Sequence, residues 1–256
     1  MPSRDAGTLR GEANIVKYVM QRPNSLGPGG YSDHRKQSSS LMLVSIGVII
    51  CYWFGAFLHT SEVLACTAPT DQAVYAINHE TYGKIGSHTL SFHCNGDDLV
   101  VETDVKVDVK IVFVTVYKRR ARYREVWRQD KLIAYDAWTD EAGDEYLTKV
   151  RIEDDQMVID GVEKGQRVSP DTVPSNPWNA DVIDRNLLFG MKDGRLLQVD
   201  VEPAGEEVIE IGEKAIRAKK YVVSGDIQRE LWYDHAGNWL RWRLESRGNI
   251  VDIIKQ

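Results

Sequence analysis

Apolar and polar residues alternate from Leu99 to Tyr117, and this pattern constrains the fold more than any other feature of the chain. Successive side chains of a β-strand point to opposite faces, so a period of two predicts a strand with one buried and one exposed face. Such strands are typical of antiparallel sheets that face water on one side. The residues that we expect to be buried are Val105, Val107, Val109, Ile111 and Phe113.

Similar strand patterns recur about every ten residues as far as Ile254, separated by turn signals rich in Gly, Asp and Asn. This spacing predicts an all-β domain, an antiparallel meander forming a strongly curved sheet or open barrel. Turns are expected at 82–84, 95–98, 128–130, 141–144, 153–155 and 204–205.

The segment Ser169–Gly190 interrupts the strand pattern. Pro170, Pro174 and Pro177 exclude central strands there, and Asp181–Leu188 could form one or two helical turns. Long irregular segments are often functional and lie at the surface. We therefore expect a lid or mouth over one end of the sheet.

The eighteen residues from Leu41 to Leu58 carry no charge. They could form about 27 Å of helix, close to the thickness of a bilayer's hydrocarbon core. Arg35 and Lys36 precede them, as in signal peptides and membrane anchors. The sequence thus predicts one N-terminal apolar helix and three parts. These are a polar disordered tail over 1–40, a signal peptide or membrane anchor helix over 41–65, and an exported β domain over 66–256.

Three fates of the apolar segment stay open. Val63 and Ala65 form a signal-peptidase-like site, and the stretch 63–66 also resembles a lipobox, in which Cys66 would be lipidated. The length of the run favours an uncleaved anchor instead. All three predict a periplasmic domain, either secreted after cleavage near Ala65 or tethered to the inner membrane. A membrane is an expected partner if the segment is uncleaved.

Cys66 and Cys94 fall in the exported part and flank a predicted hairpin, so a disulfide between them is geometrically feasible. The alternative is a free Cys94 beside a lost or lipidated Cys66. The same part of the chain is acidic, with 26 Lys and Arg against 34 Asp and Glu after Ala65, a net charge of −8. This charge argues against nucleic-acid binding.

Sequence motifs of enzymatic chemistry are not found. There is no G-x-S-x-G and no glycine pattern for phosphates or dinucleotides, so no cofactor is expected and the catalytic residues stay unknown. His88 and His93 are five residues apart and would point to opposite faces of a strand, so no metal site is expected.

Basic and aromatic residues are the binding candidates. Five Lys and Arg residues lie in 117–127. They would form either a patch for anionic ligands or the wet face of a strand, and we favour the second because basic side chains cover sheet surface with their stems. Most tryptophans of the domain are expected to pack in the core or at its rim. The tryptophans that we expect to line a ligand cavity are Trp178, Trp138 and Trp127.

Several short motifs follow one another in a recognisable order. They are Tyr82–Gly86, Val105–Tyr117, Glu125–Trp127, Ala137–Asp140, Asn176–Asn179, Tyr221–Asp226 and Leu231–Asp234. Their order, over roughly 73–256, resembles an uncharacterised family of bacterial exported proteins, a domain of unknown function of the DUF6134 type. The resemblance implies an envelope protein built from repeated β-hairpins, and it implies no activity and no catalytic residues.

These patterns favour a non-enzymatic exported envelope protein that binds an apolar ligand or lipid in the concave face of the sheet. A hydrolase acting on envelope glycans or lipids is the alternative, and whether the protein is an enzyme stays open. An apolar cavity would favour binding. Two carboxylates, or a histidine and a carboxylate, converging in a cleft would favour hydrolysis.

Overall fold

The structure, a computed structural model, describes residues 66–246 and 248–256. The predicted tail, apolar helix and cleavage site near Ala65 lie outside the described residues. Within these residues fifteen strands form one sheet, accompanied by the short 3-10 helix η1 (Ala180–Asp184). No helix in this part of the chain has the length and apolar character needed to cross a membrane.

The strands are β1 (Gln72–His79), β2 (Gly83–Asn95), β3 (Asp98–Ile111), β4 (Val114–Arg128), β5 (Lys131–Glu141), β6 (Asp144–Glu153), β7 (Gln156–Asp160), β8 (Gln166–Val168), β9 (Val173–Pro174), β10 (Leu187–Phe189), β11 (Leu196–Ile211), β12 (Lys214–Gly225), β13 (Arg229–Tyr233), β14 (Trp239–Ser246) and β15 (Asn249–Lys255).

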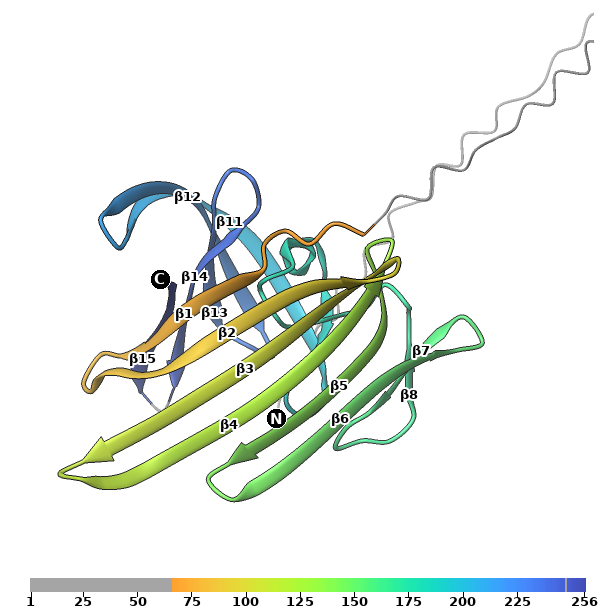
Figure 1. The fold of residues 1–256 in the computed structure, drawn as a ribbon, viewed down its shortest axis with the longest axis horizontal. Coiled ribbons are helices and arrows are strands. Elements are labelled where there is room, and N and C mark those ends of the chain that lie inside the picture. The colour runs from red at the N-terminus through yellow and green to blue at the C-terminus, as the bar shows by residue number, and fades with distance from the viewer. Residues whose placement is uncertain (1–65, 247) are drawn as a thin grey trace, which may run out of the picture. The chain divides into compact units, whose positions relative to one another are not determined.

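Strands β1 to β8 are neighbours in chain order, and so are β9 to β15 (Figure 1). The two runs are joined because β15 pairs with β1, antiparallel, with Ile77 opposite Ile253. The pair β9 and β10 is parallel, and the other neighbouring strands among the described residues are antiparallel. The sheet is therefore a meander with edges at β8 and β9, which confirms the all-β prediction and leaves the sheet unclosed.

One face of the sheet, which we call the inner face, carries the main hydrophobic core. On β3, Val101, Thr103, Val105, Val107 and Val109 are buried, whereas the residues between them are exposed or half-buried. The period-two pattern is thus confirmed over this part of the strand. The core joins residues of β1–β7 to residues of β9–β14, because the inner faces of the two halves pack against the same interior segment.

The prediction that Ile111 and Phe113 are buried is wrong. β3 ends at Ile111, and a two-residue turn at Val112 and Phe113 leads into β4. Both turn residues have positive φ, so the chain reverses there instead of continuing inward. Ile111 is 44% exposed and Phe113 is 99% exposed. The alternation alone could not reveal this reversal, because Val and Phe are not turn-forming residues.

Most other predicted turns are present. Gln129-Asp130, Ala142-Gly143 and Asp154-Asp155 all adopt positive φ between antiparallel strands. The expected turn at 204–205 is wrong, because β11 runs without interruption through it and the register with β12 shifts between Pro203 and Glu206. Proline cannot donate a hydrogen bond to the neighbouring strand, so the sequence makes a bulge instead of a turn.

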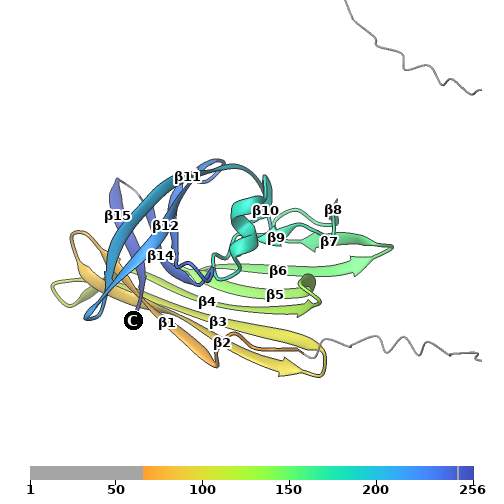
Figure 2. The same cartoon turned by 90° about the horizontal axis from the view of Figure 1, so that it is seen from above.

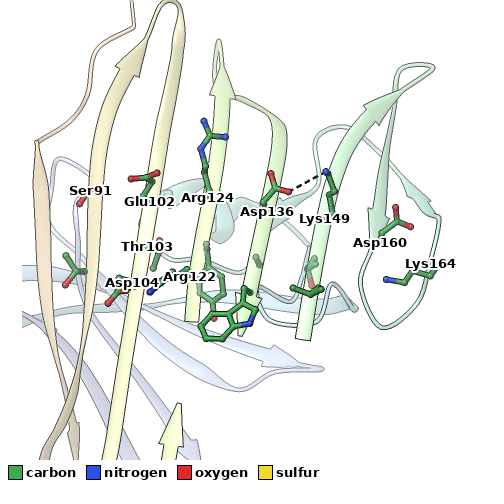
Figure 3. A pocket seen from close by; sticks show the side chains of 16 residues that line it. Ser91, Glu102, Thr103, Asp104, Arg122, Arg124, Asp136, Lys149, Asp160 and Lys164 are labelled. Atoms are coloured by element: carbon green, nitrogen blue, oxygen red, sulfur yellow. Dashed lines mark ion pairs between the residues drawn. The ribbon is translucent and has the colours of Figure 1, made fainter. Parts of the chain in front are cut away.

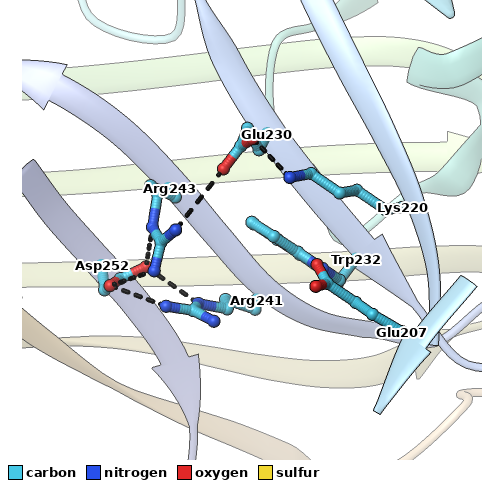
Figure 4. A network of polar contacts seen from close by, with 7 residues as sticks. All are labelled: Glu207, Lys220, Glu230, Trp232, Arg241, Arg243 and Asp252. Atoms are coloured by element: carbon cyan, nitrogen blue, oxygen red, sulfur yellow. Dashed lines mark hydrogen bonds and ion pairs between the residues drawn. The ribbon is translucent and has the colours of Figure 1, made fainter. Parts of the chain in front are cut away.

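The outer face carries a second, smaller core. Ile209, Ala218, Trp232 and Leu240 form it, one each from β11 to β14. Around Trp232, Figure 4 shows Asp252 between Arg241 and Arg243, and Glu230 between Arg243 and Lys220. Burial opposes ionisation of Asp252, but hydrogen bonds from the two arginines lower the pKa of its carboxyl. The network thus ties β12–β15 together on their outer side.

The segment that we expected to form a lid lies in the interior of the domain. Residues 169–195, which we call the interior segment, run through β9, η1 and β10, and Val173 to Pro177 are buried. Figure 2 shows η1 and β10 between β4–β6 and β11. The hydroxyl of Tyr135 donates to Met191 O at 2.6 Å, and that of Tyr233 donates to Pro177 O at 2.9 Å. The segment is thus fixed to both halves of the sheet, and β9 with Pro174 lies at an edge as predicted.

Candidate functional site

Beside the interior segment, a cavity of about 390 Å³ remains on the inner face. Its walls come from β14, β15, β1, β2, β3, β4 and the end of β5, which are consecutive neighbours in the sheet, and from Met191. The walls are mostly apolar and include Ile77, Val105, Val107, Trp242, Leu244 and Ile253. A volume of this size falls within the range of about 300–1,000 Å³ that is usual for small-molecule sites.

Arg119 on β4 brings a positive charge to the wall of this cavity. It lies opposite Val107 in the register of β3 and β4, and both residues therefore belong to the inner face. Its Nη2 donates to the Tyr123 hydroxyl at 3.0 Å, whereas its Nε has no hydrogen-bond partner among the described residues. No carboxylate in this part of the chain lies within ion-pair distance of Arg119.

Glu141, which also lines the cavity, is already paired. It accepts a hydrogen bond from the Tyr117 hydroxyl at 2.7 Å and one from Lys192 Nζ at 3.0 Å. Burial opposes its ionisation, but these hydrogen bonds and nearby positive charge lower the pKa of its carboxyl. Glu141 thus pairs with Lys192 and forms no ion pair with Arg119. Burial opposes the charge of Arg119, but Tyr123 and the negative charge of Glu141 raise the pKa of its guanidinium.

Two further residues of the cavity wall have unpartnered nitrogens among the described residues, His88 at Nε2 and Trp242 at Nε1. Burial, reinforced by the charge of Arg119, lowers the pKa of His88 to about 3, so its imidazole is neutral. The cavity therefore combines apolar walls with a guanidinium that has an unpartnered Nε, the paired carboxylate of Glu141 and two uncharged polar groups. An amphiphile with an apolar chain and an anionic head would match this combination.

Of the predicted ligand tryptophans, Trp127 and Trp178 lie together, but around a carboxylate instead of a cavity. Both donate from Nε1 to Glu125 Oε2 at 2.9 Å, and Asn176 Nδ2 donates to Glu125 Oε1 at 2.8 Å. Glu125 is fully buried, and burial raises the pKa of its carboxyl to about 7 despite these three hydrogen bonds. The cluster fastens the interior segment to β4.

The third predicted residue, Trp138, lies apart from them on the outer face. It belongs to a groove of about 1110 Å³ across the outer side of β2–β7 (Figure 3). Charged side chains of the groove pair with one another: Asp136 lies 3.8 Å from Lys149, and Arg122 lies 3.9 Å from Asp104 and 5.9 Å from the Trp138 ring. Arg120 pairs with Asp108 at 2.6 Å on the same face.

The groove is therefore a solvent-exposed sheet face on which most of the charged side chains are paired. Three of the basic residues in 117–127 belong to this face, as the sequence interpretation favoured, and Arg119 differs from them because it faces inward. The groove is the larger hollow of the two, but the cavity has the apolar walls and the arginine with an unpartnered Nε. We take the cavity as the candidate site for these reasons.

A disulfide joins Cys66 and Cys94, whose Cα atoms are 5.8 Å apart. It fastens the residues before β1 to the end of β2, at the β2–β3 turn. A sulfur in a disulfide cannot also carry a thioether lipid, so in this structure Cys66 is not free for lipidation.

Residues 66–246 and 248–256 contain few of the side-chain groupings that catalysis or metal binding would need. No three or more His, Cys, Asp or Glu side chains are grouped there as they would be around a metal ion. No hydrogen bond joins a histidine to a carboxylate among the described residues, and the ring of His79 accepts from the backbone of Thr81.

Such a structure defines a class: an open, barrel-like antiparallel sheet with an interior segment and an apolar cavity. A crystal structure of a beta-barrel-like protein of a domain of unknown function, DUF1849, from Brucella abortus is similar, with a TM-score of 0.52 at 10% sequence identity. The match covers 72% of this chain and 94% of that one and shows the fold alone. The sequence model of the domain of unknown function DUF6134 matches residues 75–256, and the chain belongs to this family. No curated protein matches the chain.

Sequence reasoning missed Arg119 and Glu125, although the signal was present. Arg119, Ala121, Tyr123 and Glu125 have a spacing of two, so they share one face, and Ala121 and Tyr123 are buried. An arginine and a glutamate in step with buried residues could have been recognised as inward-facing charges. Which ligand or partner each one meets depends on the interior segment, which the spacing cannot place.

Proposed function

We propose that the domain is a non-enzymatic exported binding protein that holds a single-chain amphiphile in the inner cavity. The observation that carries the proposal is the guanidinium of Arg119, whose Nε has no hydrogen-bond partner among the described residues, in a mostly apolar wall. The apolar chain of the ligand would pack between Val107 on β3 and Leu244 on β14. Its anionic head would pair with Arg119 and satisfy the unpartnered Nε.

Export supports this assignment because amphiphiles of this kind are components of membranes. The uncharged run 41–58 would direct the domain across the inner membrane. The disulfide is compatible with an oxidising compartment such as the periplasm. No arrangement of the described residues specifically favours the hydrolase alternative, so we do not develop it.

The test is extraction of the protein purified without added lipid, followed by mass spectrometry of what it releases. We expect an amphiphile at close to one molecule per chain. Val107→Trp should remove it, because the indole fills the cavity, whereas Lys106→Trp adds the same group to the outer face and should leave binding unchanged. A wild-type protein that releases no organic molecule would contradict the proposal. The two variants are compared once both are found to melt like the wild type.

The head-group assignment has a separate measurement, titration with a fluorescent long-chain carboxylate and with its methyl ester. Arg119→Gln should weaken binding of the carboxylate about tenfold or more, which corresponds to about 1.4 kcal/mol, and leave binding of the ester within about twofold. Equal losses for the two probes would mean that Arg119 shapes the cavity and does not pair with the ligand.

A further inference from the structure

The β3–β4 hairpin extends beyond its neighbours in the sheet. β2 pairs with β3 as far as Val107, and β5 pairs with β4 from Arg119 onward. Lys118 O still accepts from Ala142 N at 2.9 Å, and the Tyr117 hydroxyl donates to Glu141 at 2.7 Å. Residues 110–116 are therefore the part of the hairpin that has no neighbouring strand on either side among the described residues. We call these residues the free ribbon; its end is the turn between β3 and β4 in Figure 1.

The tip of the free ribbon is apolar and exposed. Phe113 is 99% exposed and Val112 82% exposed. The other exposed apolar residues of the tip are Ile111, Val114 and Val116. Because successive residues of a strand point to opposite faces, these side chains surround the tip on both sides. A contiguous exposed apolar surface of this kind marks an interaction site.

Turn geometry does not explain the residues at the tip. Val112 and Phe113 have φ of 44° and 68°, as in a type I′ turn, which prefers Asn-Gly and is costly for a β-branched residue. The same domain uses Gln129-Asp130 and Asp154-Asp155 where it makes the same positive-φ reversal. A Val-Phe turn therefore weakens the hairpin, and its side chains must be useful outside the fold.

The charges beside the tip indicate the partner. Lys110 and Lys118 are exposed, and neither belongs to an ion pair among the described residues. The nearest acidic residue on β3, Asp108, pairs with Arg120 at 2.6 Å. An otherwise acidic domain thus presents a locally cationic, apolar projection. Basic residues above an apolar tip complement anionic headgroups above hydrocarbon.

We propose that the free ribbon inserts its tip into the interface of a bilayer that contains anionic phospholipid, with Lys110 and Lys118 at the headgroups. The tip reaches about two residues, or about 7 Å, beyond Lys110, similar to the depth of about 5–10 Å for interfacial segments. A protein groove would accept one apolar face, whereas fluid hydrocarbon accepts a projection that is apolar on both sides. Val116 also lines the cavity, but the membrane contact does not rest on ligand binding there.

The experiment must report on the tip itself, because the apolar run 41–58 can also bind membranes. In the full chain, Cys51→Ser with Thr115→Cys leaves one free thiol, at the exposed position 115, since Cys66 and Cys94 are in a disulfide. That thiol is labelled with the fluorophore NBD. The chain is then reconstituted into vesicles of phosphatidylglycerol and phosphatidylethanolamine. We expect a blue-shifted emission that is quenched by doxyl-labelled lipid, and stronger quenching than in vesicles of phosphatidylcholine.

The matched variant replaces Val112→Asn and Phe113→Gly, the residues that the turn prefers. It should melt at the same or a higher temperature and lose both the blue shift and the quenching. As a positional control, the label is moved to Ala142→Cys in the β5–β6 turn, where no quenching is expected. An unquenched wild-type tip in anionic vesicles would overturn the proposal. So would a blue shift without vesicles that grows with protein concentration, because the tip would then bind a second copy. Equal quenching in phosphatidylcholine would overturn the role of the two lysines.

Discussion

At the scale of the residue, two buried ionisable groups oppose each other. The carboxyl of Glu125 has a pKa of about 7 when folded, so folding favours its protonated form and stability falls as the pH rises from about 4.5 to about 7. The imidazole of His88 has a pKa of about 3 when folded, so folding favours its neutral form and stability falls as the pH drops below about 6.5. Between about pH 4.5 and 6.5 the two slopes cancel.

Glu125→Gln separates these effects. In the variant, the amide oxygen of the glutamine can accept from Trp127 and Trp178. Its amide nitrogen can donate to Asn176 once that side chain turns its unpartnered Oδ1 toward it. The free energy of unfolding of the variant, relative to wild type, should therefore rise by about 3 kcal/mol between about pH 4 and about pH 8. Urea titrations of both proteins across this range measure the difference. A difference that stays constant with pH would show that Glu125 does not titrate in the folded protein.

At the scale of the element, two substitutions in β3 test which face of the sheet is buried. Val101→Asp places a charge at a fully buried position opposite Glu125, so it should cost several kcal/mol, comparable with the total stability of about 5–15 kcal/mol. Glu102→Val changes the next residue, which is exposed, and should alter stability by about 0.5 kcal/mol or less. Thermal melts of the two variants decide this, and a folded Val101→Asp beside an unfolded Glu102→Val would reverse the faces of the strand.

The elements also show why period-two patterns predicted some residues and not others. From Val101 to Val109 each residue packs against neighbouring strands, so alternation in the sequence becomes alternation in burial. Beyond Val107 the pairing with β2 ends, and the same pattern continues into residues 110–116, which have no neighbouring strand among the described residues. In β14, Leu240 joins the outer cluster and Trp242 lines the cavity, because the register against β13 shifts between Trp232 and Tyr233. Bulges and strand ends are set by neighbours and leave weak marks in the sequence.

At the scale of the whole molecule, the proposal of export makes a topological prediction. An alkaline phosphatase fused after Gln256 should be active in a Gram-negative host, because that enzyme folds with its disulfides only outside the cytoplasm. A fusion made after Lys36, before the apolar run, should be inactive and serves as the matched control. An inactive fusion at Gln256, together with an active β-galactosidase fusion at the same position, would contradict periplasmic localisation.

The sequence by itself determined the all-β class, most of the turns and the inward face of the best-patterned strand. These properties depend on contacts within a strand or a hairpin, where spacing and turn chemistry act over a few residues. It also marked the interior segment, because three prolines prevent it from joining the sheet as a central strand.

Only the tertiary structure decided that β15 pairs with β1, and therefore which strands enclose the cavity. It also placed Trp127 and Trp178 on Glu125, Trp138 on the outer face and Arg119 without a carboxylate partner. Apart from the contact between Trp127 and Glu125, which are two residues apart, these arrangements depend on residues that are far apart in the chain or in the sheet. The physical reason is that such long-range pairings follow from how the whole sheet curves around residues 169–195, and no local propensity specifies them.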